Sequence, residues 1–375
     1  MCESCGQQVN AKDEDNHKKS FCQLLRANIQ VIEGIKTRQD EMFNEIKTIS
    51  ARQKEIMEKQ NKLEETQERH ATYNQNIFII GGGYGCERET TAVKTVELYN
   101  IAERSSKIVK EFEQPLVSSA LCVHDNRILV SGGVGDEDNS DEIRVLNINQ
   151  HLQFAILGKL PFKLFGHDVV VHEGYLYLIG GCIWHERKTL NEIYQISLTP
   201  PYTAKLLTKM PEPRRHHKAA IVNGKLFILG GAPTGKSEDA IGSVFVYDLI
   251  RKEFKERPSL PRPVSRMSIV TWGDKIVAFG GMDKEGRAIN DVIMYDTETG
   301  QSETLPAMIH KRFGSSAVIT NDIIIVLGGW NKEQGYLNSV ESFNIGGDRW
   351  KELPGMIEGR CWATAVVKPH IKFPK

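Results

Sequence analysis

The sequence predicts an all-β domain built from six repeated units and preceded by one long helix. Pairs of glycines recur at intervals of 48 to 51 residues between Gly81 and Gly329, and each pair follows a short apolar run. Ahead of them lies a segment without proline in which apolar residues recur at every seventh position. Repeats of this size indicate β-units that stack on one another, because each is too small to bury its own faces.

Residues 23–70 are predicted to form a coiled coil. The seven-residue period places apolar side chains at heptad positions d and a: Ile35, Met42, Ile49, Ile56 and Leu63 at d, and Leu25, Ile32 and Ile46 at a. A seven-residue period keeps one stripe of apolar side chains facing a partner helix only if the two helices supercoil around each other. Polar groups at a restrict register and oligomer number, and this segment has Gln39, Gln53, Gln60 and Gln67 there. We expect a dimer or a trimer; the alternative is a single solvated helix or one packed on the β domain.

Each repeat is predicted to contain antiparallel strands joined by tight turns. Residues that tolerate positive φ, such as Asn223-Gly224 and Asn321-Asp322, precede the apolar run and indicate a hairpin. A third strand follows each glycine pair and often ends in an aromatic residue before Asp or Asn, as at Tyr247-Asp248, and a fourth strand comes next. The six pairs are Gly81-Gly82, Gly132-Gly133, Gly180-Gly181, Gly230-Gly231, Gly280-Gly281 and Gly328-Gly329.

The repeats resemble those of the Kelch family over about residues 74–368. The resemblance rests on the glycine pairs, on the downstream Tyr-Asp, and on Trp350 ahead of Leu353-Pro354. It implies a six-bladed β-propeller of four-stranded antiparallel blades over residues 71–368, with a tail at 369–375. Leu146 and Ile196 depart from the pattern, because they stand where the third-strand tyrosine is expected.

The ends of the repeat region predict how the ring closes. Between the predicted helix and the first glycine pair there is room only for the strand at residues 76–80, so the first blade is one strand short. Residues 360–367 resemble the innermost strands of other repeats, yet no glycine pair follows them. We therefore expect this C-terminal strand to pair with residues 77–80, which removes the open sheet edge that invites aggregation.

The first 22 residues contain a possible zinc site. Cys2, Cys5, His17 and Cys22 form a Cys-x2-Cys-x11-His-x4-Cys pattern, and four such ligands suit a closed, tetrahedral, structural Zn²⁺ site. The segment resembles small Cys-Cys-His-Cys fingers, some of which bind ubiquitin. The alternative is a polar tail with three unrelated cysteines.

Composition argues against several classes of partner. The 48 basic and 48 acidic residues cancel, so no global field draws the chain to nucleic acid or to an anionic membrane. No stretch is apolar enough to span a bilayer, and residues 1–10 lack the apolar core of a signal peptide. Isolated cysteines do not suggest a disulfide framework. We expect a cytoplasmic protein with reduced thiols.

Enzymatic motifs are weak. Gly230 to Ser237 satisfies the P-loop formula, but that motif needs a helix to begin at its lysine, and the strand at residues 244–247 follows too soon. No zinc-protease helix or nucleophile elbow occurs. Some Kelch propellers are copper oxidases or sugar-processing enzymes, usually secreted. We expect no enzymatic activity, with that class as a remote alternative.

One face of the predicted propeller is the expected binding site. Loops that enter the blades and loops that follow the glycine pairs share this face, where arginines beside aromatic side chains suit carboxylates. Some Kelch members line a peptide-binding mouth with arginine at the entry position. The predicted ligand-binding residues are Arg214, Arg215, His216, Arg266, Arg312 and Arg360 from the entry loops, and Tyr84, Trp184, Trp330 and Asn331 from the others. The alternative is that these charges bridge blades or are ordinary solvated charges.

These features predict a scaffold or adaptor that forms homo-oligomers through the coiled coil and binds acidic segments of partner proteins. The zinc-finger-like start favours a ubiquitin-pathway role, with ubiquitin or ligase components as partners. A Kelch protein that crosslinks actin filaments is the alternative.

Overall fold

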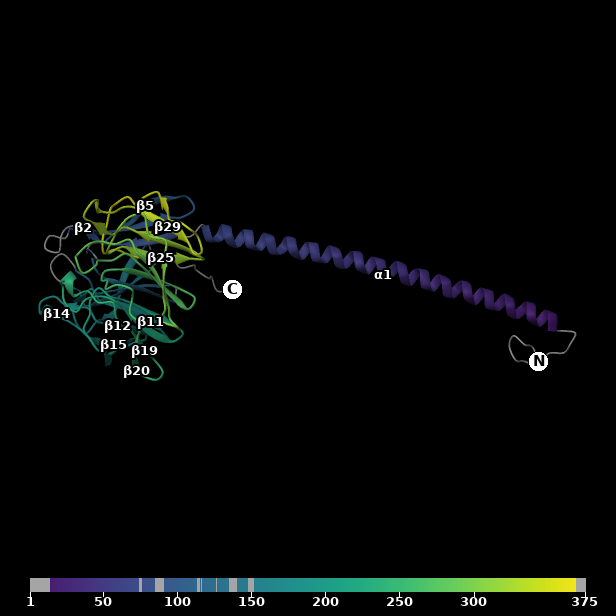
Figure 1. The fold of residues 1–375 in the computed structure, drawn as a ribbon, viewed down its shortest axis with the longest axis horizontal. Coiled ribbons are helices and arrows are strands. Elements are labelled where there is room, and N and C mark those ends of the chain that lie inside the picture. Colours follow the sequence, from purple (N-terminus) through teal and green to yellow (C-terminus); the bar gives the residue numbers. More distant parts are fainter. Residues whose placement is uncertain are drawn as a thin grey trace. The chain divides into compact units, whose positions relative to one another are not determined.

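The computed structural model describes residues 14–73, 76–84, 91–112, 115, 117–125, 127–134, 140–147 and 152–368. The chain divides into two units, residues 1–71 and residues 72–375. The described part of the first unit belongs to α1 (Glu14–Tyr73), one continuous helix of 60 residues, drawn in purple and blue in Figure 1. Among the described residues, none of the helical stretches combines the length and apolar content that a membrane crossing requires.

The second unit is a β-propeller whose described residues form six four-stranded antiparallel blades (Figure 1). Blade 1 contains β31 (Thr364–Val367), β1 (Asn76–Ile80), β4 (Thr95–Asn100) and β5 (Ser105–Glu111). Blade 2 contains β6 (Ala120–His124), β7 (Arg127–Ser131), β8 (Glu142–Asn147) and β9 (Gln153–Lys159). Blade 3 contains β11 (Asp168–His172), β12 (Tyr175–Ile179), β15 (Glu192–Ser197) and β16 (Ala204–Lys209).

The remaining three blades repeat the same order. Blade 4 contains β17 (Lys218–Val222), β18 (Lys225–Leu229), β19 (Val244–Asp248) and β20 (Glu253–Arg257). Blade 5 contains β21 (Ser268–Trp272), β22 (Lys275–Phe279), β23 (Val292–Asp296) and β24 (Ser302–Leu305). Blade 6 contains β25 (Ser316–Thr320), β26 (Ile323–Leu327), β29 (Val340–Asn344) and β30 (Lys351–Leu353).

Short strands lie between the second and third strands of several blades. They are β2 (Gly83–Tyr84) with β3 (Thr91–Ala92), β13 (Cys182–Ile183) with β14 (Lys188–Thr189), and β27 (Trp330–Asn331) with β28 (Gly335–Tyr336). The strand β13 also pairs with β10 (Leu164–Phe165), which precedes β11 in the segment that enters blade 3. After Gly230-Gly231 the chain forms only the 3-10 turn η1 (Ser237–Asp239) before β19. The helix that a P-loop requires is therefore not formed there, as the sequence argument predicted.

The ring closes through both ends of the propeller, as predicted. β31 pairs antiparallel with β1, with Ile77 opposite Val367 and Ile80 opposite Thr364. The innermost strands contact one another in the order β6, β11, β17, β21, β25 and β31, and β31 returns to β6. They enclose a central cavity of about 190 Å³.

The core lies between neighbouring blades. One apolar cluster joins Tyr177 and Ile179 of blade 3 to Leu226 and Tyr247 of blade 4, all of them buried. Ile196, which replaces the expected tyrosine in blade 3, is fully buried and packs with Leu176 of its own blade. Each blade thus buries its faces against its neighbours, which is the physical basis of a repeat array.

The glycine pairs lie where one blade meets the next. Gly230 has a φ of 57°, and a Cβ there would lie 2.5 Å from the carbonyl oxygen of Val264 in the segment that enters blade 5. Gly231 donates its backbone N–H to that same oxygen at 2.9 Å. Any side chain at Gly230 would push the blades apart, so the doublets mark inter-blade contacts.

Candidate functional site

One end of the central channel, here called the mouth, is built from the segments that enter the blades and those that follow the glycine pairs. In each blade one residue of the entering segment bridges to a residue after the glycine pair: Cys361 to Gly83, Val117 to Val134, Phe165 to Cys182, Arg215 to Ala232, Ser265 to Met282, and Phe313 to Trp330. The two groups of loops therefore share one face, as the sequence predicted.

The residue after each bridge adopts a left-handed backbone. The φ values fall between 52° and 63° at Ser118, Gly166, His216, Arg266, Gly314 and Trp362, one residue from each blade. Non-glycine residues held in this region cost roughly 1–3 kcal/mol each and are concentrated at functional sites. The mouth therefore holds three large side chains, those of His216, Arg266 and Trp362, on strained backbone.

Backbone hydrogen bonds between blades hold these residues in place. His216 N donates to Gly166 O at 2.7 Å, and Arg266 N donates to His216 O at 2.8 Å. Gly314 N donates to Arg266 O at 2.9 Å, and Trp362 N donates to Gly314 O at 2.8 Å. These bonds form a belt around the mouth from blade 3 through blades 4, 5 and 6 to blade 1, which offsets part of the backbone strain.

Aromatic rings form a continuous series of contacts at the mouth, here called the aromatic arc. Its members in order are Trp184, Phe165, His216, Trp362, Phe313 and Trp330, and successive ring centroids lie 5.2–5.9 Å apart. Tilted and edge-to-face geometries at these separations are favourable for aromatic pairs. Trp184 is 51% exposed, so the arc has an accessible end.

The contact between His216 and Trp362 spans the channel. Blades 4 and 1 are opposite one another in a six-membered ring, yet the two ring centroids are only 5.3 Å apart. The glycines at the same position in blades 3 and 6 make room for them. A Cβ at Gly166 would lie 3.0 Å from the His216 ring, and one at Gly314 would lie 3.2 Å from the Trp362 ring.

Two partly buried arginines stack on the aromatic arc. The Arg266 guanidinium lies 5.4 Å from the centroid of Trp362 and 5.5 Å from that of Phe313. The Arg215 guanidinium lies 5.6 Å from the Phe165 ring, and its Nε donates to Thr234 O at 3.1 Å. Arginines fixed over aromatic faces present a planar fork of N–H donors that matches a carboxylate.

A pocket of about 70 Å³ lies at the mouth among these residues. Its lining includes His167, His216, His217, Arg266 and Trp362. Burial lowers the pKa of His167 to about 4, and the pKa values of His216 and His217 lie well below the usual range because of burial and the nearby arginines. These imidazoles are neutral near pH 7, so the positive charge of the mouth comes from its arginines and from Lys218, which lines the pocket and pairs with Asp168 at 3.3 Å.

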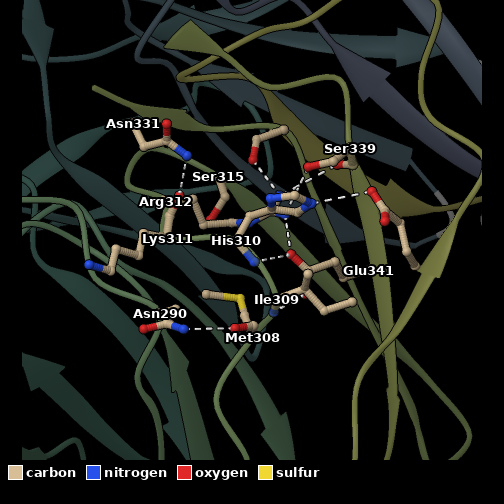
Figure 2. A network of polar contacts seen from close by, with 12 residues as sticks. Asn290, Met308, Ile309, His310, Lys311, Arg312, Ser315, Asn331, Ser339 and Glu341 are labelled. Atoms are coloured by element: carbon tan, nitrogen blue, oxygen red, sulfur yellow. Dashed lines mark hydrogen bonds and ion pairs between the residues drawn. The ribbon is translucent and has the colours of Figure 1, made fainter. Parts of the chain in front are cut away.

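Arg214, Arg312 and Arg360 do not line the open mouth, and their prediction as ligand-binding residues was wrong. Their side chains are at most 1% exposed. In Figure 2 the Arg312 guanidinium lies among groups of its own blade: its Nη1 donates to Gly328 O at 2.7 Å, and its Nη2 to Ser339 Oγ at 2.9 Å and to the Glu341 carboxylate. These guanidinium contacts lie within one blade, so neither a bridge between blades nor an ordinary solvated charge describes Arg312.

The other two buried arginines make similar contacts. Arg360 Nη1 donates to Gly81 O at 3.0 Å, and Nη2 pairs with Glu97 at 3.0 Å and with Glu358 at 2.8 Å. Arg214 pairs with Glu212 at 2.7 Å and lies over the Phe245 ring. Burying a guanidinium without such partners would cost several kcal/mol.

The remaining predicted residues are divided between the mouth and the scaffold. Asn331 is buried, and its Nδ2 donates to Lys311 O at 2.8 Å and to Gln334 Oε1 at 3.0 Å, so its amide supports the loop (Figure 2 shows the first bond). Arg215, His216, Arg266, Trp184 and Trp330 all lie at the mouth. Tyr84 lies in β2, next to Gly83, which bridges to Cys361, but its side chain is not among those described.

Three members of the site were missed: Phe165, Phe313 and Trp362. The repeat spacing could have indicated Trp362, because it occupies the same place in its segment as His216 and Arg266. Phe165 and Phe313 precede the left-handed glycines at the bridge position, where Arg215 lies in blade 4. Counting back from the following glycine pair would have aligned Phe165 and Phe313 with Arg215, and the resemblance of residues 360–367 to the innermost strands would have aligned Trp362.

The predicted zinc site stays a prediction. Cys2 and Cys5 lie outside the described residues, and His17 and Cys22 fall within α1, where their side chains are not described. Within the described ranges, no cluster of three or more His, Cys, Asp or Glu side chains could hold a metal ion.

Comparison with known proteins agrees with the repeats and the blades. The profile of the KLHDC2/KLHL20/DRC7 Kelch-repeats domain matches residues 22–231 and 166–368. The chain belongs to the Kelch-repeat family. Proteins of this family generally act by binding other proteins.

Individual relatives match parts of the chain. Kelch domain-containing protein 10 of Homo sapiens is 28% identical over 157 residues, covering 39% of this chain and 35% of the relative. Kelch-like protein 40 of Xenopus laevis is 28% identical over 238 residues, covering 56% and 34%. The chain thus spans little more than a third of the curated relatives that it matches. A solved structure, "Structure of YjhT", has a TM-score of 0.59 at 15% identity, covering 67% of this chain and 87% of that one, which supports the fold alone.

Proposed function

We propose that this protein is a non-enzymatic adaptor whose propeller mouth binds an acidic segment of a partner protein. The observation that carries the proposal is the stacking of Arg215 and Arg266 on the aromatic arc beside the mouth pocket. Buried aromatic and arginine side chains are the residue types that dominate binding energy at protein interfaces. The arginines would pair with carboxylates, while the rings would contact the apolar parts of the segment.

The backbone at the mouth suggests variants that keep the fold. Arg266 and Trp362 take the same left-handed conformation as Gly166 and Gly314. Glycine adopts this conformation without strain, so R266G and W362G remove a mouth side chain at a position where other blades already have glycine.

The test is a binding measurement on the full chain. Partner proteins are captured from cell extract on the immobilised protein, and a synthetic acidic peptide from a captured partner is titrated by calorimetry. We expect R266G to weaken peptide binding at least tenfold, because it removes a charged hydrogen-bond donor and its stacking. Strong salt dependence should accompany the wild-type interaction.

The matched control is R349A. Arg349 is an exposed arginine between β29 and β30, at the end of these strands away from the mouth. R349A removes one positive charge, as R266G does, but away from the mouth. R349A should therefore bind the peptide with the affinity of the wild type. Equal affinity of R266G and the wild type, with both folded, would contradict the proposed site.

Two partner classes follow from the sequence, and one comparison separates them. A ubiquitin-pathway adaptor would bind ubiquitin or ligase components, and a zinc chelator would abolish ubiquitin binding if the N-terminal finger is responsible. A cytoskeletal protein would instead sediment with purified actin filaments. We propose the first version, on the strength of the Cys2, Cys5, His17 and Cys22 pattern. Ubiquitin titration with and without chelator would decide it.

A further inference from the structure

We propose that α1 assembles with two further copies of this chain into a parallel three-stranded coiled coil. The proposal rests on the adaptor function, since it specifies how many propeller mouths one assembly presents. The structure supplies the surface. Apolar side chains from Leu24 to Met57 along α1 are 46–66% exposed. Such a stripe is stable in water only when a partner covers it.

The residues at the core positions favour three strands over two. Position d carries the exposed residues Ile35, Met42, Ile49 and Ile56, and the exposed apolar residues at position a are Leu25, Ile32 and Ile46. Two-stranded parallel coiled coils prefer leucine at d, whereas isoleucine at both a and d shifts the preference to higher oligomers. Isoleucine occupies three of these four d positions and two of these three apolar a positions, so the apolar part of the seam is nearer the second pattern.

The width of the apolar stripe on α1 also favours three strands over two. Apolar side chains also occupy the flanking positions: Leu24 and Val31 at g, and Ile29, Phe43 and Met57 at e. In a dimer most of each e and g side chain remains in water, so charged residues are usual there. With three helices a wider arc of each one faces the others, and these side chains become buried.

The polar core positions favour parallel and in-register chains. The a positions are apolar at Leu25, Ile32 and Ile46 but carry glutamine at Gln39 and Gln53, both exposed on α1. An antiparallel arrangement would set glutamines of one helix against the apolar layers of another and bury amides without partners. In parallel register the glutamines of each layer meet one another and can hydrogen-bond. The C-terminal ends of the three helices, from each of which a propeller continues, then lie together.

The experiment is sedimentation equilibrium of the full chain over a wide range of concentration. We expect a mass three times the 42.3 kDa of the chain. A monomer, dimer or tetramer as the main species would overturn the proposal. Fluorophores attached at the N-terminus should show energy transfer among all three chains if the helices are parallel, and transfer only between two of them if one helix runs in the opposite direction.

Two variants separate the coiled coil from general misfolding. I35L/I49L/I56L restores the dimer pattern, with isoleucine at a and leucine at d, and should shift the mass to twice that of the chain. I46D places a charge in the seam and should give monomers whose propeller unfolds at the wild-type temperature. The control is A51L, at outward position f, which should remain trimeric.

Peptide binding distinguishes this proposal from the adaptor function. Monomeric I46D should bind the acidic peptide with unchanged affinity per mouth but dissociate faster from a surface densely coated with it, because avidity is lost. If the wild type is not a trimer but still binds the peptide, only the oligomer proposal fails. If R266G binds like the wild type while the trimer forms, only the mouth proposal fails.

Discussion

Two residue positions in each entering segment have distinct roles. The position of Arg214, Arg312 and Arg360 lies inside the blade, and the position two residues later points into the mouth at His216, Arg266 and Trp362. In blade 5 the first position holds Val264 instead of arginine, and Ile293 stands in β23 where β29 has Glu341. The same site can therefore be filled by an ion pair or by apolar side chains.

Removing one partner of a buried pair should be costly. R312V leaves Glu341 charged and buried, and we expect it to destabilise the propeller by roughly 3–5 kcal/mol, measured by urea unfolding. The double variant R312V/E341I copies blade 5 and should recover part of that loss. A double variant less stable than R312V would contradict this account of the pair.

Buried histidines at the mouth should make stability depend on pH. The pKa of His167 is about 4 in the folded chain against 6.5 when unfolded, so the unfolded state binds the proton first. Its contribution is complete above pH 6.5 and is lost as pH falls towards 4, by about 2 kcal/mol at pH 5. Melting temperatures across this range should fall less steeply for H167Q, and the exposed-residue control H185Q should follow the wild type.

The directions of individual side chains at the mouth could not be predicted from the sequence. Arg214 and His216 are two apart, so strand alternation predicts one common direction for their side chains. The left-handed backbone at His216 breaks that alternation, and nothing in a single sequence marks a histidine as left-handed. The contact between His216 and Trp362 was equally hidden, because it depends on the opposition of blades 4 and 1 across the channel.

At the scale of the element, the strands and their closure were predictable. The glycine pairs are required by contacts between blades, so they recur wherever one blade meets the next. The missing strand of blade 1 and the surplus C-terminal strand then left a single way to complete the ring. β31 pairs with β1 in that arrangement, and the buried pair of Arg360 with Glu97 reinforces it.

Deleting residues 360–375 should therefore unfold or strongly destabilise the whole propeller. The deletion exposes the edge of β1, opens the apolar cluster around Phe78 and Val366, and leaves Glu97 without its guanidinium. Thermal unfolding followed by circular dichroism measures the effect. A chain that lacks only residues 369–375 keeps β31 and should melt like the wild type. An unchanged melting temperature after the larger deletion would show that β31 does not close the ring.

At the scale of the whole molecule, one unit provides a binding mouth and the other an apolar helix surface. The 3.5-residue spacing along α1 was visible in the sequence because heptads are local. The composition of the aromatic arc was not visible in the sequence, because its members come from blades 1, 3, 4 and 6. Local periodicity thus predicts the helix and the blades. The proposed binding surface could not be predicted in this way, because it is formed by residues from repeats far apart in the sequence.

The pairing of β31 with β1 also constrains how the protein is made. The strand that completes the first blade leaves the ribosome after every other strand of the propeller, so β1 keeps an open edge until β31 has emerged. Long-range pairing of this kind is slow to form and exposes aggregation-prone strands meanwhile. Newly made chains should therefore depend on chaperones until residue 367 has emerged.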